Sequence, residues 1–275
     1  MFTLCLCTAL LAAPASVDLA VETTYSDNLS VTPDNMDDPI EGAHSRVSAA
    51  LHKTVVLSEK FSMMGRIGLG CHQYHIDQSA DYWSASAAIA ANFRPFPDFY
   101  LPYFKFSLSA RQQDYRNEFH PDQILRAKFS AHKQWTPNFL ASVGIAAREG
   151  YDEWPVVDTV NFGYWDTSQY EIFLGMDFRV KNMIIYGEVS RSEGDLIWTT
   201  AQNANYVSAS QGPNYVGLLW NENSRTDSLE LGINIPLSAH SALDLLGSFS
   251  QARYSGRKMY DKTSLSLAYM HRFSF

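Results

Sequence analysis

The strongest constraint on the fold of this chain is the alternation of apolar and polar residues along most of its length. Residues 262–275 show the pattern most clearly. One set of alternate positions holds the large apolar side chains, which are Leu265, Leu267, Tyr269, Phe273 and Phe275. Successive side chains of a β-strand point to opposite faces, so this period of two predicts a strand with one apolar face and one small or polar face.

About twelve segments of the chain carry this alternation. They lie near residues 17–27, 45–57, 61–75, 82–94, 103–113, 124–135, 139–150, 170–180, 183–195, 226–237, 242–254 and 262–275. Short connections at 58–60, 95–99, 136–138, 181–182 and 238–240 alternate with long ones near 28–44, 76–81, 114–123, 151–169, 196–224 and 255–258. Residues 48–57 and 85–93 are rich in alanine, but neither has a helical stripe as regular as its alternation. The pattern therefore predicts an all-β chain.

The composition narrows the environment in which these strands fold. The 275 residues are 46% hydrophobic, 13% aromatic and 18% charged, yet no apolar run of about 18 residues follows the N-terminal segment. A helical membrane protein is therefore excluded. The net charge of −8 argues against a general nucleic-acid binder, because phosphate contacts require a basic face.

Two architectures remain, a soluble β-sandwich and a membrane barrel. The segments run for about ten residues, which suits a tilted strand that crosses the hydrocarbon core, whereas soluble strands more often have about 5–6. Aromatic residues such as Phe61, Phe93 and Trp135 lie where segments meet short connections, as membrane-interface residues do. A sheet in lipid must also close on itself, since its edges would have no hydrogen-bond partners. We therefore predict a closed antiparallel up-and-down transmembrane β-barrel of about 12 strands.

The N-terminal residues have the pattern of an export signal. Residues 2–13 are nearly all apolar, and Ala13-Pro14-Ala15 matches a signal-peptidase site. We predict a signal peptide over 1–15, cleaved after Ala15, and a single barrel over 16–275; the alternative is a buried first strand or helix. Cleavage would leave Cys71 as the only cysteine, which excludes an internal disulfide and a cysteine zinc site.

The C-terminal residues AYMHRFSF (268–275) resemble the C-terminal signature of bacterial outer-membrane β-barrels, with His271 as the one departure. The resemblance implies a Gram-negative host and residence in the outer membrane, with outer-membrane lipid and lipopolysaccharide as neighbours. It also implies that Tyr269, Phe273 and Phe275 form an assembly signal for the barrel-assembly machinery. We expect a monomer.

The inward face predicted by the alternation carries charges of both signs. Its basic wall consists of Arg66, Lys105, Arg111, Arg126, Lys128 and Arg148, with His132 beside them. Its acidic wall consists of Glu171, Asp177, Glu188, Glu230 and Asp244, and Asp18 and Glu22 add further negative charge. The cations Arg179, Lys262 and Arg272 on the same side reduce the net negative charge of this wall. Opposed charges in a narrow water-filled passage orient dipolar solutes and screen ions, which predicts a narrow channel for small polar solutes. The alternative is that these charges pair with one another and fill the lumen.

Two long connections are rich in aromatic residues. Their aromatic residues include Trp154, Trp165, Tyr206, Tyr215 and Trp220. These rings could stack on sugars or fold inward as a constriction, or they could form an outer aromatic belt on a self-packed loop. The corresponding alternative function is a non-conducting structural or adhesion barrel that acts through its outer loops.

A further alternative is an enzyme at the barrel rim that hydrolyses lipid or peptide. His72, His75 and Asp77 are the nearest candidates, with Asp152 and Asp158 in another loop. No nucleophile motif accompanies them, so we do not predict catalysis. The spacing of His72 and His75 places them on opposite faces of a regular strand, and no phosphate-binding glycine motif occurs, so we expect neither a metal nor a cofactor.

Overall fold

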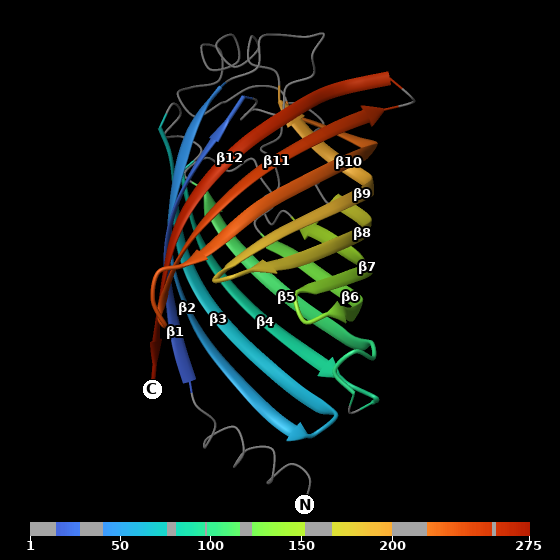
Figure 1. The fold of residues 1–275 in the computed structure, drawn as a ribbon. Helices are drawn as coiled ribbons and strands as arrows, with labels where there is room; N and C mark the ends of the chain where they lie inside the picture. The colour runs from blue at the N-terminus through green and yellow to red at the C-terminus, as the bar shows by residue number, and fades with distance from the viewer. Residues whose placement is uncertain are drawn as a thin grey trace, which may run out of the picture.

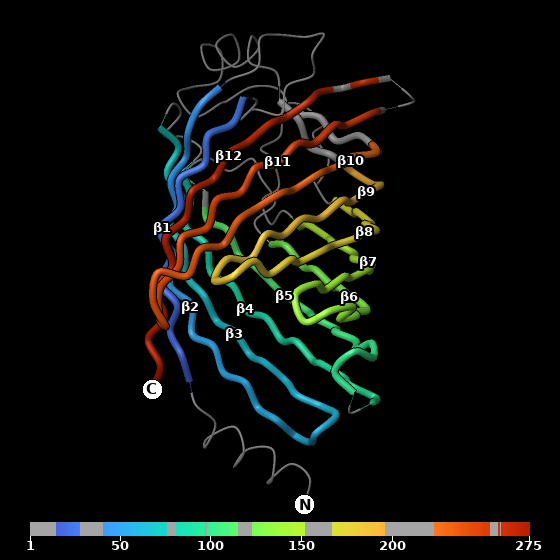
Figure 2. The backbone as a smooth tube through the Cα atoms, in the orientation of Figure 1, coloured from blue at the N-terminus to red at the C-terminus, as the bar shows by residue number. Residues whose placement is uncertain are grey.

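The computed structural model describes residues 15–27, 41–75, 81–96, 98–115, 123–151, 167–199, 219–254 and 257–275. These residues form twelve strands and the turns next to them. They are β1 (Ala15–Ser26), β2 (Gly42–Ser58), β3 (Phe61–Tyr74), β4 (Tyr82–Phe93), β5 (Tyr103–Tyr115), β6 (Gln123–Thr136), β7 (Phe139–Tyr151), β8 (Thr167–Val180), β9 (Met183–Thr199), β10 (Leu219–Pro236), β11 (Ser241–Tyr254) and β12 (Arg257–Ser274). Each strand pairs antiparallel with its sequence neighbours, and β1 pairs with β12, which closes the barrel (Figures 1 and 2). The predicted fold class is confirmed.

Backbone hydrogen bonds seal the junction between the first and last strands. Ser16 lies opposite Ser274, and the pairing runs without a shift to Ser26 and Ser264. Beyond the ladder, the Phe275 N–H donates to the Ala15 carbonyl at 2.9 Å. Ala15 therefore belongs to the ladder at the point where we predict signal cleavage; the other residues of the predicted signal, 1–14, lie outside the described ranges.

The outward face of the barrel is apolar and exposed. Ile67, Leu69, Ile172 and Leu174 are 57–65% exposed, and they alternate with inward-facing residues on β3 and β8. Burying such side chains is favourable by about 1.5–3 kcal/mol each, so a continuous surface of them requires an apolar environment. The exterior is therefore the surface that a bilayer covers. No helix in the described ranges is long and apolar enough to cross a membrane.

The strands follow the predicted segments closely, with one systematic difference on the long-connection side. There β9 continues to Thr199, β10 begins at Leu219 and β12 begins at Arg257, so the long connections are shorter than predicted. Trp220 was expected in a loop, but its backbone lies in β10, opposite Trp198. Alternation of apolar residues ends where the hydrocarbon ends, whereas the backbone hydrogen-bond ladder continues through polar residues.

The short connections and both ends of the barrel sequence lie at the same end of the molecule (Figure 1). The turns include Glu59–Lys60, Pro137–Asn138 and Lys181–Asn182. In outer-membrane barrels the short turns lie on the periplasmic side and the longer connections on the external side, and we name the two ends of this barrel accordingly.

One glycine permits a close approach inside the barrel. The Phe173 ring on β8 is 3% exposed and lies over Gly144 of β7, where a Cβ atom would overlap both the ring and the Phe129 carbonyl. We expect Gly144→Ala to lower the free energy of unfolding of the refolded barrel by about 1–3 kcal/mol, because the ring and the backbone must both shift. Urea unfolding in detergent measures the loss. Gly65→Ala is the matched control, since a Cβ at Gly65 meets no atom within 4 Å, and an equal loss in both variants would contradict the explanation.

Candidate functional site: the charged lumen

The residues of the predicted basic wall lie on four strands, β3 and β5 to β7. Their positions alternate with exposed apolar side chains, so they face the lumen: Arg66 on β3, Lys105 and Arg111 on β5, Arg126 and Lys128 on β6, and Arg148 on β7. Arg126 lies directly opposite Arg148 across the β6–β7 pair. Like charges at opposed positions repel one another unless an anion lies near both, so positive charge is concentrated on this wall.

The residues of the predicted acidic wall occupy inward positions on the next strands. Glu171 and Asp177 lie on β8, Glu188 on β9, Glu230 on β10 and Asp244 on β11. Glu188 lies directly opposite Glu230. Asp244 is held by its neighbours, because it accepts hydrogen bonds from the Tyr186 hydroxyl at 2.7 Å and from Asn234 Nδ2 at 3.1 Å.

Ion pairs join the two walls where β6 and β7 meet β8 and β9. Arg126 Nη2 lies 2.7 Å from Glu171 Oε2, and Lys128 Nζ lies 3.5 Å from Glu188 Oε2. Both contacts reach across intervening strands. They can do so because the inward positions between them hold small residues, among which are Ser142, Gly144, Ala146 and Gly175. Lys128 also lies over the Phe173 ring, 3.7 Å from its centroid.

A second set of ion pairs lies at the other boundary between the walls, around β1. Arg272 of β12 donates two hydrogen bonds to Asp18, at 2.7 Å from Nε and 2.8 Å from Nη2. His52 Nε2 of β2 lies 3.0 Å from the same carboxylate. Arg46 lies 3.9 Å from Glu22. Arg46 and His52 were not among the predicted wall residues, although the alternation over 45–57 already placed both on the inward face.

Three cations of the basic wall have no close carboxylate among the described residues. Within the described ranges, no carboxylate oxygen lies within 4.0 Å of Arg66, Lys105 or Arg111. Nearby, Arg46 Nε and His72 Nε2 are buried without a hydrogen-bond partner in the part of the chain that the structure describes. Pairing at the two boundaries therefore leaves part of the basic wall without a carboxylate partner among the described residues.

The two rim histidines that the structure describes contact different partners. The His72 ring stacks on Tyr82 with centroids 4.1 Å apart, whereas His75 Nε2 contacts the Ser45 hydroxyl at 2.9 Å. Asp77, Asp152 and Asp158 lie outside the described residues, as do Trp154, Trp165, Tyr206 and Tyr215; of Trp220 only the backbone is described. Among the described side chains, no group of three His, Cys, Asp or Glu residues is placed to hold a metal ion.

No protein-family model matches this chain, and no curated protein matches it significantly. Among solved structures, the chain is similar to an outer membrane channel from Pseudomonas putida F1, with a TM-score of 0.60 and 9% identity over 95% of this chain and 96% of that one. It also aligns with the NanC porin, with a TM-score of 0.49 and 7% identity over 92% and 98% of the two chains. The closed twelve-strand barrel, its exposed apolar exterior and the first likeness define the fold, an antiparallel β-barrel similar to that of an outer membrane channel.

Proposed function

We propose that this protein is a narrow outer-membrane channel for small polar solutes, with one basic and one acidic lumen wall. The observation that carries the proposal is the set of charged side chains at inward positions on both halves of the barrel. Charges are costly to keep inside a protein unless they are paired or hydrated. Arg66, Lys105 and Arg111 have no close carboxylate in the described part, which favours a hydrated lumen over one filled by paired side chains.

The dimensions of such a barrel fit a small solute. Twelve strands about 4.8 Å apart and tilted by about 40° give a backbone radius of about 12 Å. Inward-pointing arginine, lysine and glutamate side chains reduce the free bore well below that value. A passage of this kind selects by size and charge, as rings of charged side chains do in other pores.

Single-channel recording in planar bilayers tests the proposal. We expect discrete conductance steps from the purified, folded barrel. We also expect a reversal potential in a potassium chloride gradient that indicates a preference for chloride, because the basic wall holds the cations without close carboxylates. A folded barrel that inserts into the bilayer and gives no conductance steps would remove the channel proposal.

A further inference from the structure

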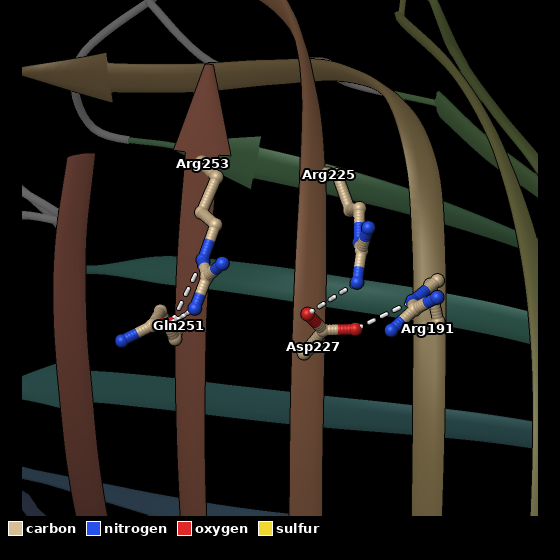
Figure 3. Close-up of polar contacts among 5 residues, drawn as sticks. All are labelled: Arg191, Arg225, Asp227, Gln251 and Arg253. Carbon is tan, nitrogen blue, oxygen red and sulfur yellow. Dashed lines mark hydrogen bonds and ion pairs between the residues drawn. The ribbon is translucent and has the colours of Figure 1, made fainter. Parts of the chain in front are cut away.

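A polar cluster interrupts the apolar exterior of the barrel on β9, β10 and β11. Figure 3 shows its members, Arg191, Arg225, Asp227, Gln251 and Arg253, which we call the exterior arginine cluster. On β10, Arg225 and Asp227 share the outward face with the exposed Leu229 and Leu231, which follow them toward the periplasmic end. The cluster therefore lies at the external edge of the apolar band, at the level of lipid headgroups.

Hydrogen bonds and ion pairs fix the geometry of the exterior arginine cluster (Figure 3). Arg191 Nε lies 2.6 Å from Asp227 Oδ1, and Arg225 Nη2 lies 3.1 Å from Asp227 Oδ2. Arg253 Nε donates to Gln251 Oε1 at 2.9 Å. The single carboxylate of Asp227 thus orients two guanidinium groups, while Gln251 orients the third.

The cluster retains positive charge after these contacts. Arg225 and Arg253 lie directly opposite each other on β10 and β11, an arrangement that repels unless an anion lies near both. Two carboxylates lie beside the cluster: Glu193 is opposite Arg225 on β9, and Asp261 of β12 accepts a hydrogen bond from Gln251 and pairs with Lys258. No carboxylate oxygen in the described ranges lies within 4.0 Å of Arg253, and Arg225 Nε is buried without a hydrogen-bond partner. Guanidinium groups offer several donors in a planar fork that suits phosphate oxygens.

An apolar groove adjoins the cluster. It has a volume of about 640 Å³ and is lined mainly by outward-facing residues of β5 to β9, with Arg191 and Glu193 of β9 at its edge. Ala127 and Ala147 form its low floor between larger side chains that include Phe129 and Tyr170. The register pairs Ile172 of β8 with Arg191 and with Ile145, so the groove crosses the strands from Arg191 into the exposed apolar face. We call it the alanine groove.

We propose that the exterior arginine cluster binds the phosphate group of a membrane lipid, and that an acyl chain of the same lipid lies in the alanine groove. The cluster and the groove are adjacent through Arg191, and together they match a lipid with an anionic head at the interface and an apolar tail below it. The site faces the bilayer and not the lumen, so it is independent of channel activity.

Native mass spectrometry of the folded barrel in a nonionic detergent tests the proposal. The probes are short-chain phosphatidic acid, short-chain phosphatidylcholine and inorganic phosphate, each titrated separately. We expect phosphatidic acid to bind tightest. Binding should weaken by roughly tenfold or more in Arg225→Gln/Arg253→Gln, because charge-assisted hydrogen bonds to the phosphate are lost.

Matched variants distinguish the loss of the cluster or the groove from the general effects of removing charge or adding bulk on the exterior. Lys53→Gln/Lys133→Gln also removes two outward cations, but on β2 and β6, and should leave phosphatidic acid binding unchanged. Ala147→Phe fills the groove floor and should weaken phosphatidic acid binding several-fold, whereas Ala49→Phe, on the exposed face of β2, should not. If the double arginine variant does not fold, Arg253→Gln alone and added salt, which screens the phosphate contact, supply the same comparison.

Four outcomes would overturn the proposal. Unchanged phosphatidic acid binding in the arginine variant removes the cluster as the headgroup site. Equal binding of phosphatidic acid and phosphatidylcholine removes the requirement for an anionic head. If inorganic phosphate binds as tightly as the lipid, the site binds the free phosphate ion and does not require a lipid. If the unmodified barrel is a dimer and the arginine variant is a monomer, the occupant of the site is a second copy of this chain.

Discussion

Phe275→Ala should abolish most assembly of the barrel in cells while leaving its refolding in detergent unchanged. The Phe275 ring is 78% exposed, so it adds little to packing in the folded barrel; only its backbone N–H joins the ladder, and alanine retains that group. A large effect in cells must then come from a partner that binds the ring before the barrel closes. An aromatic anchor contributes about 2 kcal/mol or more to a protein interface, a factor of about thirty in affinity.

The heat-modifiable band of the folded barrel in outer-membrane fractions measures this effect, alongside refolding yield in detergent. Phe99→Ala is the matched control, because Phe99 is also an exposed phenylalanine, 56% exposed, in the turn between β4 and β5 at the same end of the barrel. Normal cellular yield of Phe275→Ala would refute the assembly-signal interpretation of Tyr269, Phe273 and Phe275. Equal losses in cells and in detergent would instead indicate a role in stability.

Glu171→Gln/Glu188→Gln should shift the ion selectivity of the channel strongly toward anions. The two carboxylates neutralise Arg126 and Lys128 at the boundary of the walls, at 2.7 Å and 3.5 Å. Glutamine keeps the size of each side chain, so the bore stays the same while two negative charges are removed. Two unit charges a few ångströms from a passing ion change its energy by about 1 kcal/mol or more even in a hydrated pore, which predicts a roughly fivefold change in the permeability ratio.

The reversal potential in a salt gradient measures this change. Glu149→Gln/Glu193→Gln removes two carboxylates from outward positions on β7 and β9, so it alters net charge equally and should leave the selectivity as it is. The same shift in both variants would mean that the total charge of the barrel sets selectivity. No shift in either variant would show that Glu171 and Glu188 do not face the permeation path.

The strands and their faces followed from sequence because both depend on local alternation. The segments near 61–75 and 139–150 differ from β3 and β7 by one residue at one end. Apolar residues in lipid must occupy every second position of a spanning strand, so position along the strand decides the face. The inward placement of Arg126 and Glu188 needed no further information.

The exterior arginine cluster escaped the sequence analysis for a related reason. On β10 the outward face passes from Leu229 to Asp227 and Arg225 without a break in the ladder, and on β11 it passes from Phe249 to Gln251 and Arg253. When strand ends are predicted from the alternation of apolar residues, such polar residues are assigned to the beginning of a loop. Charged residues that continue the outward face of a strand are the signal that would have revealed the cluster.

The sequence alone determined that the chain forms strands, how many there are and which face of each meets lipid, because those properties repeat every two residues. Only the tertiary structure decided which charges meet. Lys128 and Glu188 lie on strands separated by two others, and their contact depends on the register of each pair and on small side chains such as Gly144 and Gly175 between them. Register is set by the accumulated pairing of all twelve strands around a closed barrel, which no single segment encodes.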